Sequence, residues 1–189
     1  MKHKIFGQVA VCVAALAFLG GCSLYQSAVD YFRADSEGKC PDLMILAEGA
    51  TLPAFDPAKA DGDPSGLVYT VTMTDVTSSC SYRKKRNKTS SDFVVTFKAS
   101  RPGGGDAAVY KVPYFLAVTI NGKVVKKTMY SQEIAFEAGA SHAVEDVDLD
   151  DVETWAATTR QPADYHYVVG FQLTRAQLDY VKKMGRFGP

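Results

Sequence analysis

The four cysteines are the residues of this 189-residue chain whose chemistry depends most on their surroundings. A thiol can be acylated, ligate a metal or form a disulfide. Cys12 lies inside an apolar run at the start of the chain, and Cys22 follows directly after this run. Cys40 and Cys80 lack the CxxC spacing and the histidine partners that are typical of redox or metal sites. The spacing therefore favours a disulfide between Cys40 and Cys80 and sets Cys22 apart, at the end of the apolar run.

The segment that leads to Cys22 has the layout of a secretory signal. Lys2 and Lys4 precede an apolar run over 5–19, which is too short for a comfortable membrane span. Leu-Gly-Gly stands directly before the cysteine, and this segment resembles the lipobox of bacterial lipoproteins. The resemblance implies a cleaved signal peptide at 1–21 and a palmitate-type diacylglyceryl thioether on Cys22. An ordinary secreted protein that is cut nearby is the alternative.

Lipidation would anchor the mature chain to a membrane. Each buried methylene contributes about 0.8 kcal/mol, so the two or three acyl chains of this protein class hold stably. We therefore expect residues 22–39 to be an acylated tether and residues 40–189 to form a domain that faces the periplasm. Ser23, directly after the cysteine, favours the outer membrane by resemblance to enterobacterial sorting. Lys2 and Lys4 are lost with the signal, so the formal charge becomes 19 − 21 = −2, which argues against a nucleic-acid partner.

Alternation of apolar and polar residues predicts antiparallel strands across the domain. The predicted strands cover 43–47, 67–74, 93–99, 112–120, 124–136, 142–149 and 165–173. Asn121-Gly122 is a strong hairpin signal between two of them. The run 112–120 is apolar on both faces, so we expect it to be central or covered on both sides. The stretch 51–66 is rich in Pro, Gly and Asp and predicts a loop.

The end of the chain predicts a helix, because Thr174 and Gln177 form a capping box and Gly185 follows the last apolar position. About six to eight short strands with one terminal helix indicate a mainly β domain. We expect an antiparallel β-sandwich with a short C-terminal helix, for which an immunoglobulin-like topology is one form. A small barrel capped by the helix is the alternative.

Two acidic segments are candidate cation sites. The first opens like an EF-hand loop, with Asp61, Asp63, Ser65 and Gly66, but its twelfth position is Thr72 in place of Glu. A turn is therefore the favoured interpretation. The second lies on and after the sixth predicted strand, where a solvated strand face is the simpler interpretation and a docking surface the alternative. Its acidic residues are Glu145, Asp146, Asp148, Asp150, Asp151 and Glu153.

Other residue groups give weaker functional signals. The basic segment 83–88 joins two predicted strands and is interpreted as a solvated loop, with contact to anionic lipid or lipopolysaccharide phosphates as the alternative. Trp155 is typical of a core or rim position, with a ligand groove as the alternative. His142 and His166 are the only histidines after the signal, and the sequence has no nucleophile elbow or zinc-type spacing. We therefore predict no enzyme, no catalytic residue, no metal and no cofactor.

The C-terminal part also resembles a known group of sequences. The residues that carry this resemblance are Val169-Gly170-Phe171-Gln172-Leu173-Thr174, Gln177-Leu178 and Tyr180, with Pro113-Tyr114-Phe115 and Cys40-Pro41 upstream. Together with the lipobox, this set is similar to a family of alphaproteobacterial outer-membrane lipoproteins of unknown function. The resemblance implies the same localisation and adds no activity.

The sequence therefore predicts a lipid-anchored envelope protein whose β domain acts without catalysis. We expect it to be an interaction or structural module. Its lipid would anchor it to the membrane, and its partner would be another envelope protein. A module that binds a small ligand, a glycan or a cation is the alternative.

Replacing Cys22 by Ala removes the acyl attachment site that the lipobox implies. We expect Cys22→Ala to shift the protein from the membrane fraction to the soluble fraction, because no acyl chain remains to be buried. Cell fractionation with immunoblotting measures this shift. Cys12→Ala is the matched control, since that cysteine leaves with the signal. A Cys22→Ala protein that stays fully membrane-bound would contradict the anchor.

Overall fold

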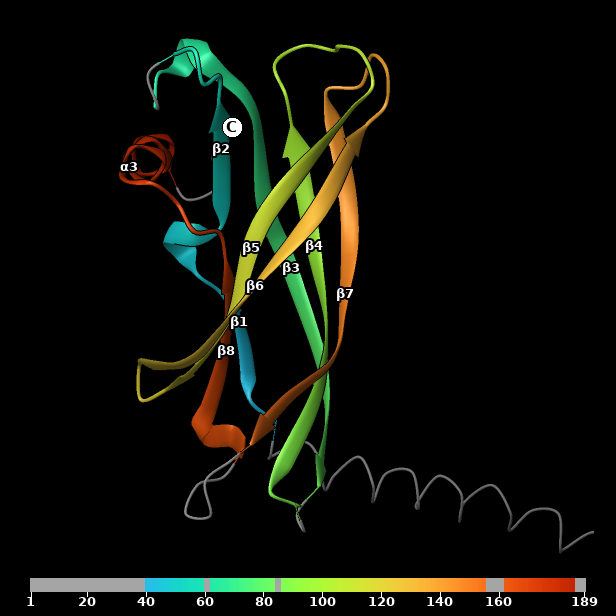
Figure 1. The fold of residues 1–189 in the computed structure, drawn as a ribbon, viewed down its shortest axis with the longest axis vertical. Coiled ribbons are helices and arrows are strands. Elements are labelled where there is room, and N and C mark those ends of the chain that lie inside the picture. Colours follow the sequence, from blue (N-terminus) through green and yellow to red (C-terminus); the bar gives the residue numbers. More distant parts are fainter. Residues whose placement is uncertain (1–39, 60–61, 84–85, 156–161, 186–189) are drawn as a thin grey trace, which may run out of the picture. The chain divides into compact units, whose positions relative to one another are not determined.

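The computed structural model describes residues 40–59, 62–83, 86–155 and 162–185 (Figure 1). The predicted signal, the acylation site Cys22, the tether and Asp61 lie outside these residues. The strands are β1 (Asp42–Ile45), β2 (Thr51–Phe55), β3 (Leu67–Arg83), β4 (Lys88–Ser100), β5 (Ala108–Ile120), β6 (Lys123–Phe136), β7 (His142–Trp155) and β8 (Tyr165–Gly170). The helical elements are the 3₁₀ turns η1 (Ala47–Gly49), η2 (Pro64–Gly66) and η4 (Pro162–Asp164) and the helix α3 (Arg175–Met184). None of the described helices is long and apolar enough to cross a membrane.

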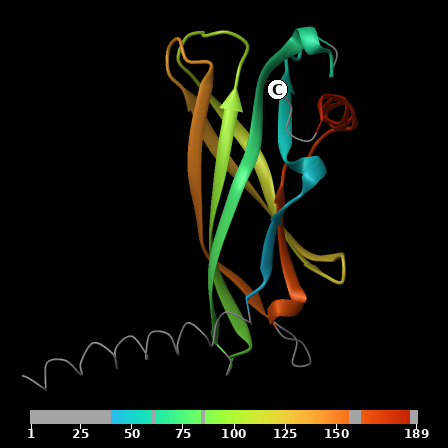
Figure 2. The same cartoon turned by 180° about the vertical axis from the view of Figure 1, so that it is seen from behind.

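The strands form two four-stranded sheets that pack face to face. The first sheet has the order β1-β8-β5-β6, and the second has the order β2-β3-β4-β7. Neighbouring strands run antiparallel, except that β1 runs parallel to β8. β5 and β6 pass in front of β3 and β4 in Figure 1 and behind them in Figure 2. The predicted mainly β sandwich with a short C-terminal helix is confirmed.

The strand order differs from that of an immunoglobulin domain. A constant-type immunoglobulin domain has its first, second, fifth and fourth strands in one sheet and its third, sixth and seventh in the other. Here β2, β3 and β4 form a continuous meander, and the β5–β6 hairpin lies in the opposite sheet. β7 then returns beside β4, and β8 returns beside β5. The chain therefore builds its sandwich with a different connectivity.

The core forms where the inner faces of the two sheets meet, because every second residue of each strand points there. Its aliphatic members include Val71, Met73, Val95, Val112, Leu116, Val118 and Val169. Aromatic rings of the two layers contact each other edge to face. The ring centroids of Phe97 and Tyr114 lie 5.2 Å apart, and those of Phe93 and Tyr167 lie 4.8 Å apart. Burial raises the pKa of Tyr114 to about 12, and the nearby Tyr130 adds to the shift, so this phenol stays neutral. Each fully buried side chain of this size contributes about 1.5–3 kcal/mol.

Local sequence signals are confirmed at the hairpin and at the helix. Asn121 and Gly122 have φ angles of 51° and 72°, the left-handed pair that a tight β5–β6 turn requires. The Thr174 hydroxyl accepts the backbone N–H of Gln177, and the Gln177 side chain accepts the backbone N–H of Thr174. This reciprocal capping box begins α3, and Gly185 with a φ of 87° ends it.

The predicted loop at 51–66 is wrong in its first part, where β2 forms. β2 is an edge strand, and an edge strand tolerates Pro53, which lacks a backbone N–H. β3 and β4 are also longer than predicted, because their Ser- and Thr-containing segments at 77–83 and 88–94 pair with each other without apolar alternation. β7 similarly continues through the acidic run to Trp155.

Cys40 and Cys80 lie at disulfide distance, as predicted, with their Cα atoms 6.0 Å apart. Cys40 precedes β1 of the first sheet, and Cys80 lies in β3 of the second sheet. The bond therefore ties the two sheets together where the described part of the chain begins.

Loss of this bond should destabilise the domain. We expect the Cys40→Ala/Cys80→Ala double variant to lose about 4 kcal/mol of unfolding free energy, because the bond closes a loop with a sequence separation of 40. Urea unfolding followed by circular dichroism measures the loss. A reducing agent should lower the unfolding midpoint of the wild type and leave that of the double variant unchanged. A wild-type midpoint that does not respond to the reducing agent would contradict the bond.

Candidate functional site

The predicted calcium-type turn uses its described carboxylate for capping. Asp63 precedes η2, and its carboxylate accepts the backbone N–H of Ser65 at 2.9 Å. The backbone and side-chain hydrogen bonds from Ser65 lower the pKa of Asp63, and the positive charge of Lys59 adds to this effect. The geometry favours the turn interpretation. In the described ranges, no group of three or more His, Cys, Asp or Glu side chains is placed to hold a metal ion.

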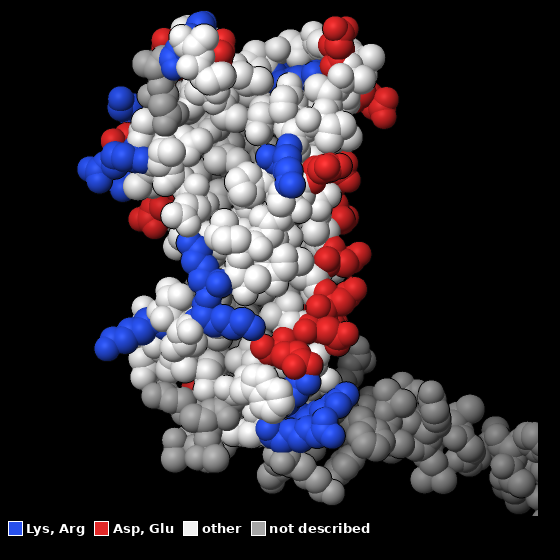
Figure 3. All heavy atoms as spheres, in the orientation of Figure 1, with Lys and Arg blue, Asp and Glu red and all other residues white. Residues whose placement is uncertain are grey.

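The acidic run lies on β7, which is an edge strand of the second sheet. Asp146 and Asp148 are exposed on its outer side, whereas Val147 and Leu149 face the core, as the alternation predicts. The Thr96 hydroxyl donates to the Asp146 carboxylate at 2.7 Å. Figure 3 shows the acidic side chains as a row along this edge. Most of these carboxylates are exposed, which favours a solvated strand face.

The last residue of the basic segment contacts the acidic strand. Lys88 forms an ion pair with Glu153 of β7, and its ammonium lies over the Trp155 ring, 5.2 Å from the ring centroid. Because Glu153 is exposed, the pair contributes little stability. In the sequence, 65 positions separate Lys88 from Glu153, so no local pattern connects the two charged segments. Only the pairing of β4 with β7 brings them together.

The two described histidines differ in their contacts with hydroxyl groups. The imidazole Nδ1 of His142 shares a hydrogen bond of 2.9 Å with the Ser141 hydroxyl on the exposed surface. His166 of β8 has its Nδ1 atom 3.5 Å from Asp42 Oδ2. Thr119 is the cross-strand neighbour of His166, but its hydroxyl donates to the backbone carbonyl of His166 at 3.4 Å. Among the described residues, no hydroxyl forms a hydrogen bond with the imidazole of His166, and nucleophilic catalysis at this position would require one.

A buried polar cluster surrounds Tyr167. Its hydroxyl lies 2.5 Å from the Thr154 hydroxyl and accepts a hydrogen bond of 3.4 Å from Ser91. All three side chains are buried. Hydroxyls from β8, β7 and β4 satisfy one another here, as buried polar groups must. The cluster therefore joins the two sheets through mutual hydrogen bonds.

The outer side of the first sheet is apolar, which is unusual for the solvated side of an antiparallel sheet. We name this surface the apolar face, and it consists of Met44, Leu46, Phe115, Ala117, Val124, Val125, Met129 and Val168. Met44 is 47% exposed, Met129 52%, Val125 56% and Val124 61%. Figure 3 shows this side of the molecule as largely uncharged surface that a group of Lys or Arg side chains crosses. Apolar residues of four neighbouring strands therefore gather on this side, which they share with Asp42, His166, Thr119 and Lys127.

Close packing within the apolar face hides the centre of β5. A Cβ atom at Gly170 would lie 3.2 Å from side-chain atoms of both Leu46 and Phe115, so these side chains meet over the glycine. Lys127 lies across the face, with its ammonium 4.2 Å from the Phe115 centroid and bonded to the Gln172 side chain at 2.7 Å. We expected β5 to be central or covered on both sides. It is central, and the core covers its inner side, but no described strand or helix lies over its outer side (Figure 1).

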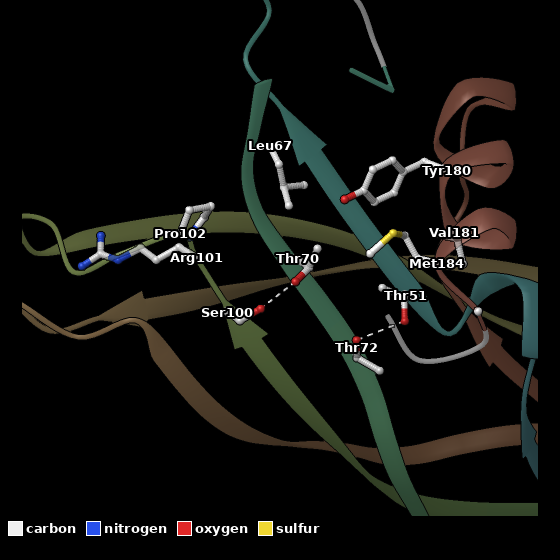
Figure 4. Close-up of a pocket in the computed structure, with 11 residues that line it drawn as sticks. Thr51, Leu67, Thr70, Thr72, Ser100, Arg101, Pro102, Tyr180, Val181 and Met184 are labelled. Carbon is white, nitrogen blue, oxygen red and sulfur yellow. Dashed lines mark hydrogen bonds between the residues drawn. The ribbon is translucent and has the colours of Figure 1, made fainter. Parts of the chain in front are cut away.

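The outer side of the second sheet is polar, and α3 covers part of it. Tyr180 of α3 contacts Phe55 of β2 edge to face, with ring centroids 5.2 Å apart. A cavity of about 210 Å³ remains between α3 and the neighbouring strands (Figure 4). The sequence predicts the helix, but no local pattern shows which sheet the helix covers.

Comparisons with protein-family models, with curated proteins and with solved structures found no match. The resemblance to alphaproteobacterial lipoproteins therefore stays a prediction. The function has to be inferred from the surfaces of this chain itself.

Proposed function

We propose that this protein is a lipid-anchored module of the bacterial outer membrane that faces the periplasm and binds another envelope protein without catalysing a reaction. The observation that supports this proposal most strongly is the apolar face on the outer side of the first sheet. Water-facing sides of antiparallel sheets are normally polar. A continuous exposed apolar patch is typical of a protein–protein contact.

The exposed side chains of the apolar face can contribute substantial binding energy. Met44, Val124, Val125 and Met129 each expose about half of their surface. Burying the exposed half of one such side chain contributes about 1 kcal/mol. Four anchors of this kind would support moderate affinity after the cost of association is subtracted. Moderate affinity suffices for a tethered protein, since tethering raises the effective concentration of its partner.

The charges beside the apolar face indicate the chemistry of the partner. Lys127 lies on the apolar face, whereas Lys126 pairs with the core residue Val118 and lines a hollow together with carboxylates of β7. The acidic side chains gather on β7 instead (Figure 3). Complementary charge favours the correct partner and speeds its encounter. We therefore expect the partner to present an apolar patch that carboxylates border.

The two forms of the alternative function, cation binding and small-ligand binding, differ in the support that the described residues give them. Asp63 caps its own turn, so the described part of that turn gives no support to cation binding. A small-ligand function is favoured by one observation, the cavity beneath α3.

A photo-activated crosslinker at Val125 of the lipidated protein in living cells tests the contact. We expect one crosslinked product of fixed mass from Val125 and none from Thr77, a matched exposed position on β3 of the other sheet. Met129→Glu should abolish the Val125 product, because it would bury a carboxylate beside the carboxylates of the partner. Met129→Leu keeps the apolar surface and should retain the product.

Mass spectrometry of the crosslinked product identifies the partner. A product that contains two copies of this chain would contradict the proposal. Equal yields from Val125 and Thr77, or a yield that Met129→Glu leaves unchanged, would also contradict it, because the contact would then not depend on the apolar face.

A further inference from the structure

A cavity lies on the opposite sheet, beneath α3. Its volume is about 210 Å³. An apolar cavity of about 150 Å³ holds benzene, so this cavity has room for one six-membered ring with substituents. Sites for drug-sized ligands are larger, at about 300–1,000 Å³. The volume therefore limits the ligand to a single ring.

Four hydroxyl groups form the floor of the cavity, on the outer side of the second sheet (Figure 4). The Thr51 hydroxyl lies 3.0 Å from the Thr72 hydroxyl, and the Thr70 hydroxyl lies 2.7 Å from the Ser100 hydroxyl. Each pair uses one hydroxyl hydrogen internally, so one hydrogen and several lone pairs in each pair stay available. The floor can therefore donate hydrogen bonds to a ligand and also accept them.

Apolar and aromatic side chains form the walls of the cavity. Leu67 lies on one side, while Tyr180 and Met184 reach from α3 toward the strands (Figure 4). The contact with Phe55 holds the Tyr180 ring in place. The Tyr180 hydroxyl makes no hydrogen bond with a residue that the structure describes, so it is a further donor and acceptor for a ligand.

The described lining residues direct no formal charge into the cavity. Arg101 is the one ionised side chain among them, and its guanidinium points away from the floor (Figure 4). Its Nε donates to the carbonyl of Ala140 at 2.8 Å, and its Nη1 donates to the carbonyl of Asp106 at 2.9 Å. An ionic ligand would lose its hydration here without gaining a counter-charge. The cavity therefore selects against anions and cations.

We infer that this cavity binds one neutral pyranose sugar. The sugar hydroxyls would exchange hydrogen bonds with the floor, and the C–H face of the ring would pack against Leu67, Met184 and the Tyr180 ring. A ring without hydroxyls would leave the floor unpaired, which costs free energy. The site lies on the second sheet and the apolar face on the first, so sugar binding stands or fails independently of the protein partner.

Saturation-transfer NMR on the lipidated protein in detergent micelles tests sugar binding. The probes are D-glucose, D-galactose and N-acetyl-D-glucosamine, and we expect at least one of them to bind and the charged D-glucuronate not to bind. Thr72→Val removes one floor hydroxyl and keeps the side-chain shape, while Tyr180→Phe removes only the phenol oxygen. Each should weaken binding about fivefold, the effect of one lost hydrogen bond. Thr77→Val, on the same strand outside the cavity, should bind as the wild type does.

Failure of all three neutral sugars to bind would overturn the inference. Binding that both cavity variants leave unchanged would overturn it too, because the sugar would then lie elsewhere. Cyclohexanol that binds as tightly as the sugars would show an apolar cavity that does not recognise hydroxyls, and this result also counts against the site. Circular dichroism establishes that each variant folds, and Tyr180→Phe decides the outcome if Thr72→Val does not.

Discussion

The packing of the two inner sheet faces is the interaction on which the rest of the structure depends. Phe93, Phe97, Tyr114 and Tyr167 join the layers through edge-to-face contacts, and the hydroxyl cluster around Tyr167 satisfies the polar groups buried with them. Because successive strand residues point to opposite sides, the register that closes the core also decides what each outer side displays. The Cys40–Cys80 pair adds a covalent link between the same two layers.

The two outer sides produced by this register differ in chemistry, and this difference underlies the proposed function. The second sheet displays hydroxyls and carboxylates, and α3 covers part of it. The first sheet displays the apolar face, which folding alone does not require, since the core is complete without it. A domain that keeps such a surface exposed risks aggregation unless something covers it. The proposed envelope partner would account both for the composition of this face and for Lys127, which lies across it.

Period-two alternation predicted the sandwich, and Asn121-Gly122 predicted its sharpest hairpin, because both signals are local. The segment 77–83 gave no such signal, since pairing with β4 stabilises its strand and its alternate residues are not apolar. The apolar character of 112–120 on both faces indicated a central or covered strand, and β5 is central, with Phe115 and Ala117 of its outer side buried. The order of the strands in each sheet is encoded by no local pattern. The cavity depends on where α3 packs, and this too is set by contacts between distant segments.

Methionine oxidation by hydrogen peroxide shows directly whether the apolar face is covered in the cell, because it reports which methionine side chains the reagent reaches. Met44 and Met129 lie in the apolar face, whereas Met184 is 43% exposed on α3 and Met73 is fully buried. Peptide mass spectrometry would compare oxidation of the purified protein with oxidation in living cells. We expect Met44 and Met129 to be protected in cells relative to the purified protein, while the buried Met73 stays unreactive in both. Equal oxidation of Met44 and Met129 in cells and in the purified protein would contradict a partner on the apolar face.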